Sequence, residues 1–159
     1  MQDKTLMWYE KLSKNPTDNN ILAEGIEYYE SELENAKNDV NIIGHFQIQV
    51  AKMPGVVDHR YAQLQELESV LKFYEILYNK SKNKAIRECL EGCKKDFSSR
   101  DSKKIAECNS EVVNFEYILN RVARIRNKYL GIHKALEVKN FQLNNIAILY
   151  SFGLEDATI

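Results

Sequence analysis

The spacing of hydrophobic residues predicts helices along most of the chain. In the first third, apolar side chains recur about every 3.6 residues after a turn at residues 15–18, where Thr17 or Asp18 can act as the N-cap. The pattern predicts an N-terminal helix that can continue through Ile43. The apolar positions of this helix are Ile21, Leu22, Ile26, Tyr29, Leu33 and Ala36.

Two longer seams of apolar residues follow, each spaced by threes and fours like one stripe of a coiled coil. The first seam comprises Leu64, Leu67, Leu71, Tyr74 and Tyr78, and the second comprises Phe115, Leu119, Val122, Ile125, Tyr129, Ile132 and Leu136. Pro54 and Gly55 are expected to stop the preceding element, and Asp58 is a candidate N-cap for the helix that carries the first seam. That helix is predicted to end near Cys93 or Phe97, and residues 98–102 read as a turn into the second helix.

These patterns predict one all-α domain spanning residues 1–159. A long antiparallel helical hairpin is expected to be its main element, joined to an N-terminal helical segment. With 159 residues and 44% hydrophobic residues, the chain can build its own core. No apolar run approaches the roughly 18 to 20 residues that would span a bilayer. The first residues also lack the basic, apolar and small-residue regions that follow one another in a secretion signal. We therefore expect a cytoplasmic protein with no membrane contact.

Charge is distributed unevenly, although the formal net charge is only −1. Residues 1–52 carry nine acids and five lysines and form an acidic N-terminal segment, whereas residues 56–159 are basic. Between residues 72 and 104 there are ten cations and five acids. Such segregation predicts that the basic segments attract polyanions locally even though the total charge is near zero.

The basic segments keep a helical rhythm, so their cations can gather on helix faces. Lys80, Lys84 and Arg87 are spaced by four and three and share a face. Tyr74, Tyr78 and Phe97 could provide stacking surfaces for unpaired bases. The predicted nucleic-acid-binding residues are Lys80, Lys82, Lys84, Arg87, Lys94, Lys95, Arg100, Lys103, Lys104, Arg121, Arg124 and Lys128.

Each basic segment also has a structural interpretation. The segment around Lys84 could be a solubilising helix whose aromatic residues are buried. The cluster at residues 121–128 could form salt bridges with the acidic N-terminal helix, within one subunit or between subunits. The sequence leaves these alternatives open beside nucleic-acid binding.

Catalytic and metal-binding patterns are weak, so we predict neither an enzyme nor a cofactor. Cys89, Cys93 and Cys108 are an odd number of cysteines without a paired C-x-x-C or a nearby histidine, and free thiols are expected. The chain has no G-x-S-x-G, no glycine-rich phosphate loop and no H-E-x-x-H.

The C-terminal segment is unusually apolar for one helix that covers one hairpin. It carries seven large apolar side chains between residues 141 and 152, more than one core-facing stripe normally holds. We predict that part of this segment contacts other copies of the chain, and the alternative is a buried closing helix in a monomer. The predicted oligomerisation residues are Phe141, Leu143, Ile146, Leu149 and Phe152.

Two stretches resemble the UvsY-type recombination mediators of T-even-like phages. KAIRECL at residues 84–90 is similar to the basic helical stretch of that family, and KNFQL at residues 139–143 lies in a run, GIHKALEVKNFQLNNI, that resembles its terminal helix. The resemblance covers about residues 64–149. It implies a small, non-catalytic, all-helical protein of phage origin that forms closed homo-oligomers in the host cytoplasm. It also implies binding to single-stranded DNA and help for a RecA-like recombinase in displacing a single-strand-binding protein.

A second function class fits the same composition. A helical structural or adaptor protein, such as a virion or assembly component, would pair its basic faces with acidic protein partners and would have no nucleic-acid role. Binding of a single-stranded oligonucleotide that weakens with salt would distinguish the mediator from the adaptor.

Overall fold

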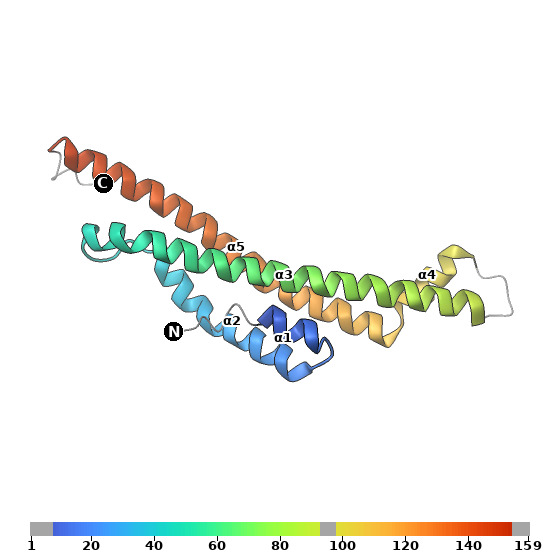
Figure 1. Ribbon diagram of the computed structural model, residues 1–159. Helices are drawn as coiled ribbons and strands as arrows, with labels where there is room; N and C mark the ends of the chain where they lie inside the picture. The colour runs from blue at the N-terminus through green and yellow to red at the C-terminus, as the bar shows by residue number, and fades with distance from the viewer. Residues whose placement is uncertain (1–7, 93–97, 154–159) are drawn as a thin grey trace.

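The protein is all-α, as predicted. A computed structural model describes residues 8–92 and 98–153, and within these ranges the chain forms five α-helices and no strand. Figure 1 shows the long helices lying together, with shorter helices beside them and at one end. The helices are α1 (Trp8–Lys14), α2 (Asn19–Val40), α3 (Phe46–Gly92), α4 (Ser99–Glu107) and α5 (Ser110–Ser151).

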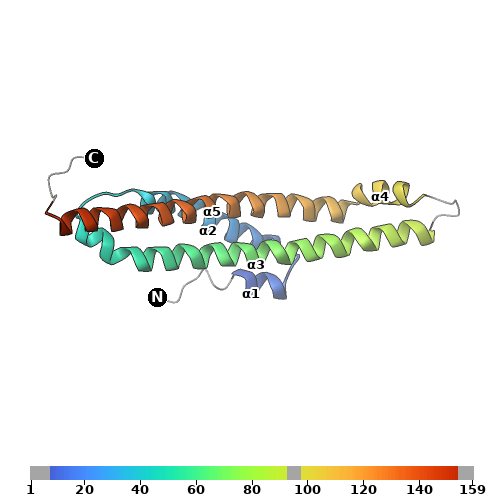
Figure 2. The ribbon, with the colours of Figure 1, turned by 90° about the horizontal axis from the view of Figure 1, so that it is seen from above.

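Helices α3 and α5 run antiparallel and pack along much of their length (Figure 2), an arrangement compatible with the predicted hairpin. The two apolar seams meet in the core. Leu67, Val70 and Tyr74 of α3 are fully buried, as are Val122 and Leu136 of α5. Burying each of these side chains contributes roughly 1.5–3 kcal/mol, so the seams hold the two long helices together.

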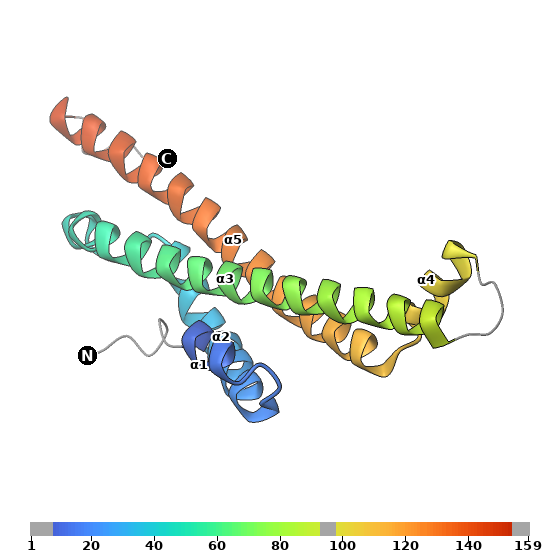
Figure 3. The ribbon, with the colours of Figure 1, turned by 45° about the vertical axis from the view of Figure 1, so that its right-hand side comes forward.

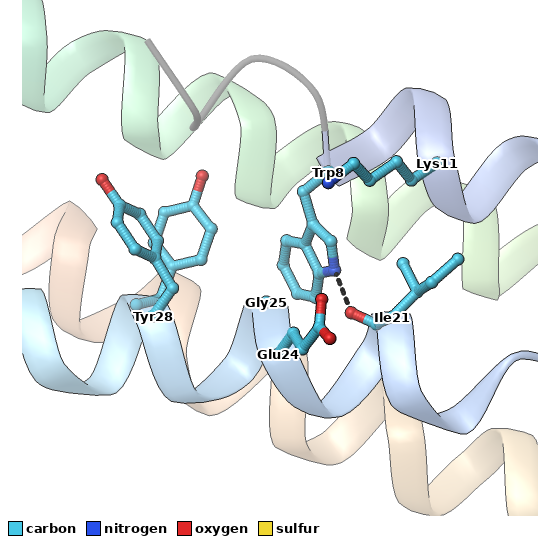
Figure 4. A pocket seen from close by; sticks show the side chains of 7 residues that line it. Trp8, Lys11, Ile21, Glu24, Gly25 and Tyr28 are labelled. Atoms are coloured by element: carbon cyan, nitrogen blue, oxygen red, sulfur yellow. Dashed lines mark hydrogen bonds between the residues drawn. The ribbon is translucent and has the colours of Figure 1, made fainter.

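Helices α1 and α2 lie together on one side of this pair (Figure 3), with α2 against α5 and α1 between α2 and α3. The Trp8 indole lies directly over Gly25, and its Nε1 donates a hydrogen bond of 3.0 Å to the carbonyl of Ile21 (Figure 4). A Cβ atom at position 25 would lie 1.9 Å from the indole ring, so only glycine permits this approach. The indole also packs 5.4 Å from the ring of Tyr29, which joins α1 to the main core.

The predicted helix stop at Pro54 is wrong. Helix α3 begins at Phe46 and continues through Pro54, and Asp58 lies inside the helix rather than at its start. An interior proline removes the hydrogen bond to the carbonyl four residues earlier, here that of Val50. Val50 and Pro54 are exposed, so water can satisfy that carbonyl. The break in the chain comes earlier, because α2 ends at Val40 instead of continuing through Ile43, and the connection contains Gly44 at φ +91°.

The predicted turn at residues 98–102 is the start of a short helix. Ser98 acts as the N-cap of α4, since its hydroxyl accepts a 3.2 Å hydrogen bond from the backbone N–H of Asp101. Asn109 then caps α5 by accepting a hydrogen bond from the N–H of Glu111. A serine therefore caps the next helix as expected, but the second long helix starts later, at Ser110. The predicted end near Cys93 or Phe97 lies outside the described residues.

Two buried cations fix the end of α2 against the long helices. The Lys139 ammonium donates to the carbonyls of Asp39 and Asn41, at 2.7 and 2.9 Å, and to Gln49 Oε1 at 2.9 Å. Burial lowers the pKa of Lys139. The Arg60 guanidinium forms a 2.6 Å ion pair with the Asp39 carboxylate. Helices α2, α3 and α5 are thus joined by polar contacts where the chain turns from α2 into α3.

Candidate nucleic-acid interface

At the α3–α4 end of the molecule both helices expose cations, and we call this set of residues the basic tip. On α3, the face that holds Ser81 and Ala85 is buried. Lys80, Lys84 and Arg87 are exposed on another side of the helix. Three further cations are exposed on α4. The basic tip comprises Lys80, Lys84, Arg87, Arg100, Lys103 and Lys104. Lys94 and Lys95, also predicted to bind nucleic acid, lie outside the described residues.

Small side chains hold α4 at the tip. Ala85, Ala106 and Val112 form a minor core that brings α3, α4 and α5 together. The Ser81 hydroxyl donates a 3.0 Å hydrogen bond to the Glu111 carboxylate at the start of α5. The tip therefore owes its shape to close packing of short residues, and its long cationic side chains remain free to extend into solvent.

Lys82 has a different position from its cationic neighbours. Its ammonium is 3.1 Å from the Glu107 carboxylate on α4 and 5.7 Å from the centroid of the Tyr78 ring. The hydrogen bond with Glu107 raises the pKa of Lys82. Lys82 thus joins α4 to α3, and it does not lie on the face shared by Lys80, Lys84 and Arg87.

The basic tip keeps a net positive charge after its ion pairs are counted. Lys84 lies 3.9 Å from the Glu88 carboxylate, a contact between exposed groups that contributes little. Residues 80–92 and 98–107 hold seven cations and four acids. Among the described residues, no ion pair involves the other five cations of the tip, Lys80, Arg87, Arg100, Lys103 and Lys104.

A second basic group lies further along α5. Arg121, Arg124 and Lys128 are exposed and share one side of the helix with Asn114 and Tyr117. Since Glu111 contacts α3 at the tip, Arg121 lies ten residues, about 15 Å, further along the axis of α5. Within 8–92 and 98–153, no ion pair links these three cations to the acidic helix α2. We call Asn114, Tyr117, Arg121, Arg124 and Lys128 the α5 basic face.

The aromatic residues available for stacking differ from those predicted. Tyr74 is fully buried and its hydroxyl donates a 3.3 Å hydrogen bond to the carbonyl of Pro16, so it offers no stacking face. Burial raises the pKa of Tyr74 to about 12. Tyr78 is half-buried beneath Lys82, and Phe97 lies outside the described residues. Tyr117 was missed, although its place outside the apolar seam and four residues before Arg121 could have indicated it; its side chain is 59% exposed.

The opposite end of the molecule has the reverse character. Residues 41–51 and 140–153 contain no Asp, Glu, Lys or Arg, and we call these two segments the uncharged end. The rings of Phe46 and Tyr150 lie 5.5 Å apart and bring the segments together. Large apolar side chains exposed on this end are Ile42, Ile43, Ile48, Val50, Phe141, Ile148, Tyr150 and Phe152.

The predicted oligomerisation residues divide into two groups at this end. Phe141 and Phe152 are 66% and 75% exposed, whereas Ile146 and Leu149 are half-buried. Leu143 is 1% exposed and belongs to the core, so its predicted contact with a second copy is wrong in this fold. The difference arises because α5 still packs on its neighbours at position 143, while position 141 points away from them.

A metal site is only weakly indicated by the three cysteines of the sequence. Within 8–92 and 98–153 there is no group of three His, Cys, Asp or Glu that could hold a metal ion. Cys89 and Cys108 are free thiols, and Cys93 lies outside these ranges. No helix in the same part of the chain is long and apolar enough to span a bilayer.

The exposed groups thus form a basic tip, the α5 basic face and an uncharged end. No protein-family model, no curated protein and no solved structure matches this chain.

Proposed function

We propose that this protein is a non-catalytic, single-stranded-DNA-binding recombination mediator that helps load a RecA-like recombinase in the host cytoplasm. The observation that carries the proposal is the basic tip, where two helices that pack through a small core expose six cations. None of these six side chains is needed to hold the helices together, so their charge is available to a ligand.

The chemistry of the tip suits a flexible polyanion. Lysine and arginine side chains on a convex end can each reach a phosphate of a strand that bends around them, and binding then releases condensed counterions. For single strands, each neutralised phosphate lowers the logarithm of the affinity by about 0.7 per tenfold increase in salt. Arg87 and Arg100 can also make bidentate phosphate contacts, which lysine cannot make.

The role as a mediator is supported by where the resembling stretches lie. KAIRECL, at residues 84–90, contributes Lys84 and Arg87 to the basic tip, and KNFQL, at residues 139–143, begins within the last turns of α5 near the uncharged end. The two stretches thus belong to opposite ends of the molecule. A protein that helps a recombinase displace a single-strand-binding protein needs one surface for DNA and another for proteins. The basic tip suits DNA, and the apolar surface of the uncharged end suits proteins.

Assembly into closed homo-oligomers is part of the same proposal. Phe141, Ile148 and Phe152 expose apolar surface within residues 140–153, which carry no Asp, Glu, Lys or Arg, and such a composition is typical of the core of subunit interfaces. Several weak basic tips held in one particle would bind a strand more tightly than one tip, with no new kind of contact.

The central test is titration of a fluorescently labelled oligothymidylate, followed by anisotropy, at two salt concentrations. The variant with Lys80→Glu, Lys84→Glu and Arg87→Glu should lose at least tenfold in affinity, and its salt slope should fall by about 2. A charge-matched control reverses Lys11, Lys14 and Lys52, which are exposed outside both basic groups. This control should bind almost as the natural protein does. Equal losses in the two triple variants would show a general charge effect and would remove the basic tip from the proposal.

A second experiment separates the mediator from a structural or adaptor protein, which the apolar uncharged end also fits. A RecA-like recombinase is added to single-stranded DNA coated with single-strand-binding protein, and its DNA-dependent ATPase is followed. The natural protein should shorten the lag, and the tip triple variant should not. An unchanged lag with the natural protein, together with salt-insensitive or absent oligonucleotide binding, would favour the adaptor.

A further inference from the structure

A groove lies between α2 and α5 beside the α5 basic face. Its volume is about 190 Å³, and its floor is apolar, since Ile26 and Ile118 are buried there beside the half-buried Leu22. Tyr117 and Arg121 of α5 line it. The groove thus combines an apolar floor with an exposed ring and a cation.

Polar groups complete the groove. The side chains of Asn19 and Asn114 line it and are exposed, and each amide can both donate and accept hydrogen bonds. The Arg121 guanidinium lies over the Tyr117 ring, 6.0 Å from its centroid, so a phosphate-binding group occupies one face of this exposed ring. Among the described residues, no Asp or Glu lines the groove.

We infer that this groove binds an unpaired nucleobase of the strand whose phosphates contact Arg121, Arg124 and Lys128. This inference rests on the proposed function and adds to it the site at which bases are recognised. The planar faces of a base are apolar and stack on tyrosine, its edges carry donors and acceptors for the two asparagines, and its phosphate is anionic. Each part of a nucleotide therefore has a partner of matching chemistry in or beside the groove.

The arrangement also explains selectivity for single strands. In a duplex the bases are stacked and paired, and moving one out costs several kcal/mol, whereas an unpaired base is free to enter. A site made only of cations would bind duplex and single strand alike through their phosphates. The groove adds a contact that depends on the base and changes little with salt.

The test compares an oligothymidylate with an abasic deoxyribose-phosphate strand of the same length, at low and high salt. The natural protein should bind the oligothymidylate about 5- to 150-fold more tightly than the abasic strand, the range expected for one stacked base, and this ratio should persist at high salt. Tyr117→Leu should reduce the ratio toward one. Tyr117→Phe, which keeps the ring, should retain the ratio.

A matched control is Tyr61→Leu, because Tyr61 is 46% exposed on α3 and lies outside the groove. It should bind both strands as the natural protein does. Circular dichroism should show unchanged helix content in all three variants. Photocrosslinking of a 5-iodouracil oligonucleotide, followed by mass spectrometry, should modify the peptide that contains Tyr117.

The outcomes distinguish the two proposals. Equal affinity of the natural protein for the normal and abasic strands, with salt-dependent binding of both, would overturn the nucleobase groove and leave single-strand binding through phosphates intact. Absence of binding to both strands would overturn the proposed function and this inference with it. An undiminished ratio in Tyr117→Leu would show that bases are read elsewhere.

Discussion

The basic tip and the uncharged end occupy opposite ends of the α3–α5 pair (Figure 2). They differ in the kind of side chain that each exposes to solvent. At the tip, the buried residues are small, such as Ala85 and Ala106, and the exposed ones include six cations together with Leu90 and Ile105. At the other end, Phe141 and Phe152 are exposed within residues 140–153, which carry no Asp, Glu, Lys or Arg. A charged surface stays in water without a partner, whereas a large apolar surface without charge is typical of a contact between proteins.

The middle of the molecule belongs to neither type. Its core is aromatic, with the rings of Tyr29 and Tyr129 5.5 Å apart, and the Tyr129 hydroxyl donates a 3.0 Å hydrogen bond to the carbonyl of Tyr29. This core ties α2 to α5 independently of both ends. Surface changes at either end should therefore alter binding while the helices stay folded, which makes the comparison testable.

The largest effect is expected from placing charge on the uncharged end. The double variant Phe141→Glu and Phe152→Glu should convert an oligomer into single chains, as measured by light scattering at micromolar concentration. Loss of avidity should then weaken oligonucleotide binding by about 10²-fold, although the basic tip is unchanged. Ile76→Glu is the control, since Ile76 is 56% exposed on α3 outside this end. A natural protein that is already monomeric under these conditions would contradict the prediction.

Two alanine substitutions, at positions 143 and 141, test where the core of α5 ends and its exposed surface begins. Leu143→Ala should lower the free energy of unfolding by about 2–5 kcal/mol, because a fully buried side chain leaves a cavity. Phe141→Ala should change it by no more than about 0.5 kcal/mol in the isolated subunit, since this ring is exposed. Urea unfolding at a concentration that favours single chains measures both. Similar losses in the two variants would mean that Phe141 is also packed within the subunit.

A smaller effect is expected at the basic tip from loss of a helix cap. Ser98→Ala removes the hydroxyl that accepts from the N–H of Asp101 and should destabilise α4 by about 1 kcal/mol. Hydrogen exchange should therefore become faster in α4 and stay unchanged in α2. Ser31→Ala, at an exposed position inside α2, is the control. Unchanged exchange in α4 would show that the contacts of α4 with α3 and α5, such as Ala106 in the minor core and the Lys82–Glu107 ion pair, stabilise this helix without its cap.

The smallest effect concerns the middle of the molecule and depends on pH. The Glu66 carboxylate is buried and accepts a 2.5 Å hydrogen bond from the backbone N–H of Tyr9, and burial raises the pKa of Glu66. An acid whose pKa is raised by folding stabilises the protein when protonated. That contribution is complete below the unfolded-state pKa and is lost as the pH rises through the folded-state pKa.

Glu66→Gln should consequently be more stable than the natural protein at pH 7, and the difference should shrink as the pH falls toward 4.5, the ordinary pKa of this group. Urea midpoints measured across this range provide the check, and other carboxylates cancel in the comparison. Glu68→Gln, at a half-buried neighbouring position, is the control for the loss of one negative charge on this helix. A natural protein that is more stable than Glu66→Gln at pH 7 would mean that the hydrogen bonds to α1 outweigh burial.

The long helices were predictable because their apolar seams repeat over many turns. Every residue of the second seam is buried except Leu119, which is half-buried. The course of α3 through Pro54 was not predictable, since it depends on whether water reaches one carbonyl. The contrast between Phe141 and Leu143 was equally hidden, because an apolar segment does not reveal which of its sides has a neighbour. Tyr74 lies in the first apolar seam, and that membership alone argued for burial.

The candidate site was predictable in part. The spacing of Lys80, Lys84 and Arg87 gave their shared exposed face. The role of Lys82 required the position of α4, and the groove beside Tyr117 required the packing of α2 on α5, neither of which local spacing contains. Lys139 shows the same limit, because a lysine near the end of an amphipathic helix suggests solvent, whereas its ammonium caps the end of α2.

The packing of Trp8 on Gly25 provides an intrinsic fluorescent probe of the position of α1. Trp8 is the sole tryptophan of the chain, and its indole is held at one place by a glycine, a carbonyl and the Tyr29 ring. Its fluorescence therefore reports whether α1 is docked, far from both the tip and the uncharged end. A shift of its emission toward that of indole in water, on addition of DNA or a protein partner, would signal that the N-terminal helix has been lifted from the long pair.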